Sequence, residues 1–310
     1  MTEDKKRLII IDSNSIIHRA YHALPRLTTK KGELVNAVYG FLLVFLKAIR
    51  EFEPAYVVAC FDLPGPTFRH KKFKEYKAKR PPAPEELYQQ IPKIKEILKT
   101  FNVPIFEKEG FEADDLIGTI AKKVSLPTSG VGELPTSGVG GLETIVLSGD
   151  LDTLQVVDKN TKVYTLKRGV KETILYDENK FFERYQFSPS LFPDFKALKG
   201  DPSDNIPGVP GIGEKTAIEL IRKFGNLENL YQELEQKSDK AKEIKPKLKE
   251  LLLQKKEQVF FSRMLAQIKK DVPINFDFKK CRFWEYNKEK VIELFKNLEF
   301  YSLTKRISEL

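Results

Sequence analysis

Hydrophobic residues in the first half of the chain form short unbroken runs that alternate with segments of helical spacing. The unbroken runs, each of which predicts a buried strand, lie at residues 8–11, 55–61, 103–106, 143–147 and 162–166. Apolar positions recur every three or four residues over residues 36–50, 84–101 and 113–124, and this spacing predicts helices. Continuous apolar strands that alternate with helices are typical of a parallel, doubly wound sheet, so the predicted fold class is α/β.

The pattern changes after about residue 185, where helical spacing replaces the apolar runs. The segment Gly208-Val-Pro-Gly-Ile-Gly213 precedes Glu214-Lys-Thr-Ala217 and a predicted helix that continues through Lys223. Glycines allow close approach of another backbone, and the first turn of a helix offers free N–H groups. This hairpin favours binding of a phosphodiester backbone, and an ordinary glycine-rich helix connection is the alternative. We therefore predict two domains, residues 1–185 and 186–310.

Three further segments complete this outline. The sequence Leu126-Pro-Thr-Ser-Gly-Val-Gly132 recurs as Leu134-Pro-Thr-Ser-Gly-Val-Gly140, and its turn-forming residues predict a surface loop over residues 125–142. Residues 237–256 contain eight lysines against three acids, which is typical of a solvated helical face. A last helix is predicted over residues 288–298, followed by a polar tail.

The composition points to a class of partner through its charge: Lys and Arg number 53 against 44 Asp and Glu, for a net charge of +9. This excess favours nucleic acid as a partner, with solubility alone as the alternative. Cys60 and Cys281 have neither metal-ligand spacing nor a disulfide framework, which indicates a reducing, cytoplasmic location. The N-terminus lacks the apolar region of a signal peptide, and the longest apolar stretch, residues 41–46, is too short to span a bilayer.

Acidic residues nevertheless concentrate in three short clusters, Glu112-Ala-Asp-Asp115, Asp150-Leu-Asp152 and Asp201-Pro-Ser-Asp204. Asp12 and Asp62 each follow a predicted strand, at the edge where open α/β sheets place their sites. Carboxylates at this density repel one another unless cations join them. Two Mg²⁺ ions about 4 Å apart suit such oxygen ligands and promote phosphodiester hydrolysis. Taken singly, each acid has an alternative role as a helix cap or a turn residue.

Residues 67–80 form a basic segment, with seven Lys and Arg residues against one acid. Phe68, Phe73 and Tyr76 are interleaved with these cations. Aromatic stacking on bases combined with phosphate contacts is typical of single-strand binding. A solvated basic loop is the alternative interpretation.

Together these residues resemble the 5′ nuclease (5′-3′ exonuclease, flap endonuclease) domain of bacterial DNA polymerase I and its stand-alone relatives. The resemblance covers nearly the whole chain, from Arg7 to about Ile307. It is carried by the motifs IIIDSNSIIHRAYHAL, FD at Asp62, TFRHKKFKEYKAKRPP, GFEADDLIGTIA, LSGDLDTLQ and LKGDPSDNIPGVPGIGEKTA. It leaves open whether the chain is a stand-alone nuclease or a truncated polymerase.

The resemblance implies a PIN-like core with a basic helical arch at about residues 67–90 and a three-helix helix-hairpin-helix region after residue 186. It implies two divalent metal ions, Mg²⁺ with Mn²⁺ as an alternative. Asp12, Asp62, Glu112 and Asp114 match the acids around the first ion, and Asp152, Asp201 and Asp204 match those around the second. Asp150 lies between the two ions, and Asp115 matches a further acid of the motif.

Other residues acquire roles from the same resemblance. Tyr76, Lys77 and Arg80 match catalytic residues of the arch, where Lys77 stabilises charge on the reacting phosphate. The residues implied in DNA binding are Arg69, Lys71, Lys196, Gly211, Gly213, Lys215 and Thr216, with K⁺ at the hairpin.

The implied function is that of a structure-specific 5′ nuclease of replication and repair. Its substrates would be DNA with a 5′ flap, a nick or a free 5′ end, and RNA primer hybrids, and the enzyme would act as a monomer. A DNA-binding module that has lost catalysis and a PIN-type ribonuclease remain as alternatives.

Overall fold

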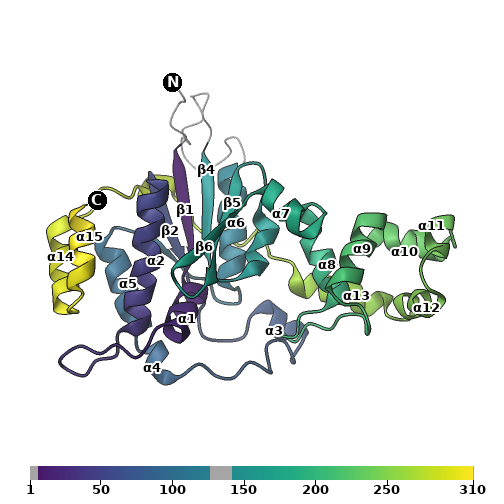
Figure 1. Cartoon of the computed structure of the whole chain (residues 1–310), viewed down its shortest axis with the longest axis horizontal. Coiled ribbons are helices and arrows are strands. Elements are labelled where there is room, and N and C mark those ends of the chain that lie inside the picture. Colours follow the sequence, from purple (N-terminus) through teal and green to yellow (C-terminus); the bar gives the residue numbers. More distant parts are fainter. Residues whose placement is uncertain (1–5, 126–141, 310) are drawn as a thin grey trace.

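A six-stranded sheet forms the centre of the computed structural model, which describes residues 6–125 and 142–309 (Figure 1). Its strand order is β3-β2-β1-β4-β5-β6. The strands are β1 (Arg7–Asp12), β2 (Tyr56–Cys60), β3 (Ile105–Phe106), β4 (Glu143–Ser148), β5 (Thr161–Arg168) and β6 (Glu172–Tyr176). All neighbours pair in parallel except β5 and β6, which are antiparallel, so the prediction of a mostly parallel sheet is confirmed.

Helices cover both faces of the sheet. One face packs against α1 (Ser13–Ala23), α2 (Asn36–Phe52), α5 (Ile91–Thr100), α14 (Lys288–Asn297) and α15 (Tyr301–Ser308). The other face packs against α6 (Ala113–Ser125), α7 (Glu178–Tyr185), α8 (Phe192–Lys199) and the 3₁₀ helices η1 (Leu151–Val156) and η3 (Phe278–Cys281). Leu8 and Ile10 of β1 belong to one core and Ile9 and Ile11 to the other, because successive strand side chains point to opposite faces.

A helical region extends to one side of this core (Figure 1). After η2 (Pro189–Leu191), α8 leads into α9 (Glu214–Phe224), α10 (Leu227–Glu235), α11 (Asp239–Lys242), α12 (Pro246–Gln254) and α13 (Lys256–Ala266). Helix α13 returns to pack on α8, which ties this region to the sheet.

Several predicted elements were wrong in extent. The helical arch predicted at about residues 67–90 contains only two short helices, α3 (Phe68–Lys72) and α4 (Glu85–Tyr88), and residues 73–84 between them form turns and extended chain. The helix predicted over residues 84–101 is interrupted at Gln89 and Gln90. The lysine-rich stretch is broken before Pro246, which begins α12. The polar tail forms α15.

Two further predictions concern the repeat-containing loop and the absence of a membrane-spanning segment. The repeat-containing loop lies outside the described residues, except at its ends. Within the described residues, no helix is long and apolar enough to cross a membrane.

Candidate active site

The carboxyl ends of three adjacent strands bring Asp12, Asp62 and Asp150 to one edge of the sheet. Asp12 is the last residue of β1, Asp62 follows β2 by two residues, and Asp150 follows β4 by two residues. Asp114 comes from the first turn of α6. These acids and Glu112 line a cavity of about 410 Å³. The sequence prediction that separate strands contribute acids to one site therefore agrees with the geometry.

Hydrogen bonds hold these acids in place without neutralising them. Asp62 Oδ1 accepts from the N–H of Ala113 at 2.7 Å. Asp12 accepts from Ser148 Oγ at 2.5 Å and, as the N-cap of α1, from the N–H of Ser15 at 3.3 Å. Burial nevertheless raises the pKa of Asp12 to about 6. Burial and the charge of Asp12 likewise raise the pKa of Asp114 well above its ordinary value. Around Asp12 and Asp114, burial and neighbouring carboxylates therefore outweigh the hydrogen bonds and nearby cations such as Lys77.

A second group of acids surrounds the ammonium of Lys196. Its Nζ lies 2.5 Å from both Asp152 Oδ1 and Asp201 Oδ2. Lys196 projects from α8, Asp152 from η1, and Asp201 from the turn that follows α8. The basic residue expected to contact DNA thus joins two predicted metal ligands.

The basic segment closes over the acids through the three residues predicted to be catalytic. Tyr76 Oη donates to Glu112 Oε2 and to Asp204 Oδ2, both at 3.1 Å. Lys77 Nζ lies 2.7 Å from Glu112 Oε1, and Arg80 pairs with Asp204. Tyr76 is only 3% exposed, so in this conformation its ring is not available to stack on a base. The segment instead links an acid of the first group with one of the second.

Two predicted site residues, Arg69 and Asp115, form a buried ion pair behind the cavity, where Arg69 also donates to Glu112 Oε2 at 3.1 Å. Arg69 Nη1 and Nη2 donate to the two carboxylate oxygens of Asp115 at 2.8 and 2.9 Å. Asp115 also accepts from the backbone N–H groups of Glu112 and Lys269, and Arg69 donates to the carbonyls of Leu265 and Gln267. These bonds use the oxygens of Asp115 and leave Arg69 2% exposed. The geometry thus gives both residues a structural role in place of the predicted metal and DNA contacts.

The remaining predicted DNA contacts lie on the surface. Lys71 is exposed in α3. Gly211 has a φ of +81°, and a side chain added at Gly211 or Gly213 would meet no atom within 4 Å. The backbone of this hairpin is therefore open to close approach, and Lys215 and Thr216 follow in the first turn of α9.

Helix α1 supplies site residues that the sequence argument missed. Asn14, Ser15, His18, Arg19 and His22 line the same cavity as the acids. Arg19 donates to the carbonyl of Gly149 at 3.1 Å, beside Asp150. The helical spacing of residues 15, 18 and 22 after Asp12 was the available signal, because it places these side chains on the face that starts at the site.

No group of three or more acid, histidine or cysteine side chains within residues 6–125 and 142–309 is already gathered to hold a metal ion. The ion pairs explain this, because Lys77, Arg80 and Lys196 occupy the space between carboxylates. The donors are nonetheless all carboxylates, a set that fits hard divalent cations.

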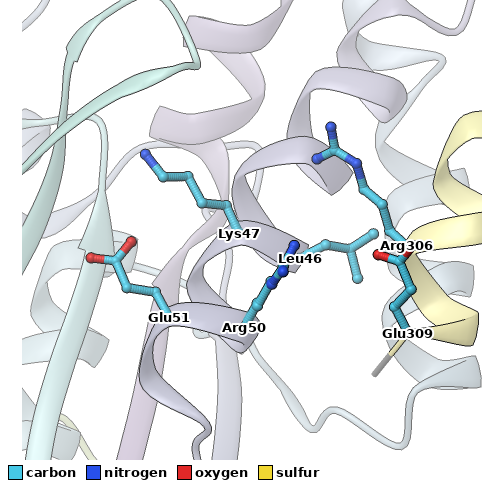
Figure 2. Close-up of a pocket in the computed structure, with 6 residues that line it drawn as sticks. All are labelled: Leu46, Lys47, Arg50, Glu51, Arg306 and Glu309. Atoms are coloured by element: carbon cyan, nitrogen blue, oxygen red, sulfur yellow. The ribbon is translucent and has the colours of Figure 1, made fainter.

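A separate cavity of about 380 Å³ lies between α2 and α15, lined by Leu46, Lys47, Arg50, Glu51, Arg306 and Glu309 (Figure 2). Phe52, at the end of α2, accepts a hydrogen bond from Arg7 at the start of β1. This cavity therefore lies toward the amino ends of the strands, away from the acids.

The parallel sheet, the acids at its carboxyl edge and the cations above them define the class of a nuclease. The chain belongs to the 5′-3′ exonuclease family: residues 7–186 match its N-terminal resolvase-like domain and residues 187–289 its C-terminal SAM fold. The family predicted from the motifs, its PIN-like fold and its class of enzyme are confirmed.

Relatives of known name agree with this assignment. DNA polymerase I of Caldicellulosiruptor bescii is 41% identical over 97% of this chain and 33% of its own length. DNA polymerase I of Bacillus subtilis is 39% identical over 100% of this chain and 33% of its own. The chain thus spans about a third of these relatives. A flap endonuclease of bacteriophage T5, solved with DNA and metal ions, has a similar fold, with a TM-score of 0.64, 18% identity and coverage of 98% of each chain.

Proposed function

We propose that this chain hydrolyses phosphodiester bonds of DNA near a 5′ end, as a 5′-3′ exonuclease and 5′-flap endonuclease in replication and repair. The observation that carries the proposal is the convergence of acids from four separate segments beneath cations of a basic segment. The T5 flap endonuclease of similar fold was solved with DNA and metal ions. RNA primer hybrids are further proposed substrates, because a site that contacts phosphates does not require a particular sugar.

The acids fit two divalent ions, for which we propose Mg²⁺, with Mn²⁺ as an alternative. Asp12, Asp62, Glu112 and Asp114 would hold the first ion and Asp152, Asp201 and Asp204 the second, with Asp150 between them. The raised pKa values of Asp12 and Asp114 support this, because they reflect buried negative charge that the nearby cations do not fully offset. When bound, such ions supply an activated water and neutralise the leaving 3′ oxygen.

The cations of the basic segment then have a second task. Lys77 and Arg80 neutralise Glu112 and Asp204 in the described conformation. Those carboxylates lead the interactions that raise the pKa of Lys77 against the effect of burial, so its ammonium remains protonated at neutral pH. Once released from the acids, Lys77 and Arg80 can bind oxygens of the reacting phosphate, and Tyr76 can orient the segment.

The hairpin serves a different part of the substrate. Its open backbone at Gly211 and Gly213, with Lys215 and Thr216, suits the phosphates of a duplex, and K⁺ bound there would add positive charge toward them. Because this contact reads no bases, recognition would depend on the junction between duplex and 5′ single strand. We propose that a monomer in the cytoplasm suffices for this task.

One substrate panel tests the proposal. Labelled 5′-flap DNA, a matched RNA hairpin and a blunt DNA duplex are incubated with Mg²⁺ or with EDTA. We expect Mg²⁺-dependent cleavage of the flap near the junction. Cleavage of the RNA hairpin alone would identify a ribonuclease, and binding of the flap without cleavage would identify a DNA-binding module.

Two substitutions test the assigned residues on the same flap. Asp152→Ala should lower the cleavage rate at least ~10²-fold, since it removes a ligand of the second ion. Asp239→Ala, which changes an exposed acid of α11, is the control and should cleave normally.

Lys77→Ala should lower turnover by a similar factor, because it removes charge stabilisation at the phosphate. Lys79→Ala is its matched control, because Lys79 is exposed in the same segment. Wild-type turnover in Lys77→Ala would contradict the role of the basic segment.

A further inference from the structure

A groove with a cavity volume of about 550 Å³ lies beside the hairpin, between α9 and α12. Leu220, Leu248 and Leu251 line its apolar part. Three cations line it, Lys223, Lys245 and Lys247, together with two acids, Glu219 and Glu243. Lys245 and Lys247 belong to the lysine-rich segment of residues 237–256, which the proposed function leaves without a task.

The lysines of this groove differ in their partners. Lys223 pairs with Glu243 at 2.6 Å. Lys245 and Lys247 are exposed, and neither lies within 4.0 Å of a carboxylate among the described residues. Other lysines of the segment, such as Lys242 and Lys256, do pair with acids. The groove therefore presents two cations that are available to an anionic ligand.

The groove is continuous with the hairpin, because Gly211 and Thr216 also line it. Thr216 and Lys223 lie seven residues apart on α9, which corresponds to about 10 Å along the helix axis. A DNA strand rises about 3.4 Å per phosphate along its axis, and neighbouring phosphates lie farther apart than this because the strand winds around the axis, so the groove has room for about two phosphates.

We propose that this groove extends the duplex-binding surface of the hairpin, with Lys245 and Lys247 contacting phosphates beyond those held by Gly211, Gly213 and Lys215. The inference rests on the proposed DNA-binding function. The apolar residues suit the deoxyribose rings of the same strand, which carry no charge. An acidic amphipathic peptide would satisfy the same lysines, but it would compete with DNA for Gly211 and Thr216.

The test measures binding of a fluorescent 5′-flap DNA with a long duplex arm, in EDTA, over a series of KCl concentrations. The double variant Lys245→Gln/Lys247→Gln is compared with wild type. We expect roughly tenfold weaker binding near 0.1 M salt. The slope of the logarithm of the association constant against log[KCl] is negative and should become less steep by about 1.8, because two phosphate contacts are lost. The rate of cleavage with Mg²⁺ at saturating DNA should remain within about twofold of wild type.

Lys290→Gln/Lys296→Gln is the matched control, because these exposed lysines lie on α14 at the opposite end of the molecule (Figure 1). It should keep both the affinity and the slope of wild type. The variant Lys215→Gln separates the proposed function from the inference about the groove. If neither wild type nor this variant binds the flap DNA, the proposed function fails. If wild type binds and Lys215→Gln weakens binding, an unchanged affinity and slope in the Lys245/Lys247 variant would overturn the inference and favour a peptide ligand.

Discussion

Asp12 combines burial, two hydrogen bonds and neighbouring negative charge in one side chain. It is 3% exposed, and Asp62 and Asp150 add to the effect of burial on its pKa. The hydrogen bonds from Ser148 and Ser15 offset only part of this effect, and the pKa stays at about 6. The protein without metal therefore keeps an unfavourable ionised carboxylate at neutral pH.

The pH dependence of stability should show this. The folded state binds a proton at Asp12 near pH 6, whereas the unfolded chain binds it only near the ordinary aspartate pKa of 3.8. Lowering the pH from 7.5 to 5 in EDTA should therefore stabilise wild type relative to Asp12→Asn, by roughly 1.4 kcal/mol. Urea unfolding of both proteins at each pH measures the difference.

Magnesium provides the complementary measurement. At pH 7.5 it should raise the unfolding midpoint of wild type, because it binds the folded state alone. The same addition should have a smaller effect on Asp12→Asn. A difference between the two proteins that is independent of pH and of Mg²⁺ would contradict the assignment of Asp12.

A second prediction at the level of single residues concerns the buried ion pair of Arg69 and Asp115. Arg69→Met leaves the fully buried Asp115 without its partner and should cost about 3–5 kcal/mol of unfolding free energy. The double variant Arg69→Met/Asp115→Leu should recover part of this loss, because the unpaired charge of Asp115 is removed, while Glu112 keeps Lys77 as its partner. Equal stability of Arg69→Met and wild type in denaturant unfolding would exclude the structural role.

At the level of elements, the apolar runs were sufficient to predict the five parallel strands and the acids that follow them at the site. The antiparallel β6 was missed because Glu172-Thr-Ile-Leu-Tyr176 is only partly buried at an edge of the sheet and has no long apolar run. The path of residues 73–84 was also missed. Their closed conformation depends on contacts of Tyr76 and Arg80 with acids more than thirty residues away, which local sequence does not encode.

The close packing of α1 against α2 is a further contact that could not be predicted from local sequence. A side chain at Gly40 of α2 would place its Cβ 2.6 Å from the Cβ of Ala20 in α1. Gly40→Ala should therefore destabilise the fold by about 1–3 kcal/mol and displace α1, which carries the cavity residues His18 and His22.

Ala20→Gly supplies the control for this crossing, because it removes the atom that the new methyl group would meet. In a double-mutant cycle followed by thermal unfolding, the two substitutions should be less harmful together than the sum of the single effects. Additive effects would show that the crossing tolerates the methyl group.

On the scale of the whole molecule, the acids and the hairpin occupy different parts of the chain. The acids gather at the sheet, whereas the hairpin lies between α8 and α9 in the helical region (Figure 1). The acidic motifs allowed the site to be predicted because strand ends meet at one edge. The ion pairs of Lys196 and Lys77 were not predictable, because they depend on how α8 and the basic segment pack on that edge.

This separation predicts that binding and cleavage respond to different substitutions. Lys215→Gln should raise the Kd for flap DNA several-fold in a salt-dependent manner and leave the maximal rate near wild type. Asp150→Asn should lower the maximal rate by at least ~10²-fold and change the Kd little. Single-turnover kinetics with varied enzyme concentration separates the two quantities, and a joint loss in both variants would contradict the division.

The lysine and arginine side chains that lie among the carboxylates have a consequence for the folding of the newly synthesised chain. Lys77, Arg80 and Lys196 act as internal counter-ions, so Glu112, Asp204, Asp152 and Asp201 have a partner before any metal arrives. A newly synthesised chain can therefore complete its fold while free magnesium is scarce. Purified protein should refold from urea in EDTA with native circular dichroism and regain nuclease activity once Mg²⁺ is added.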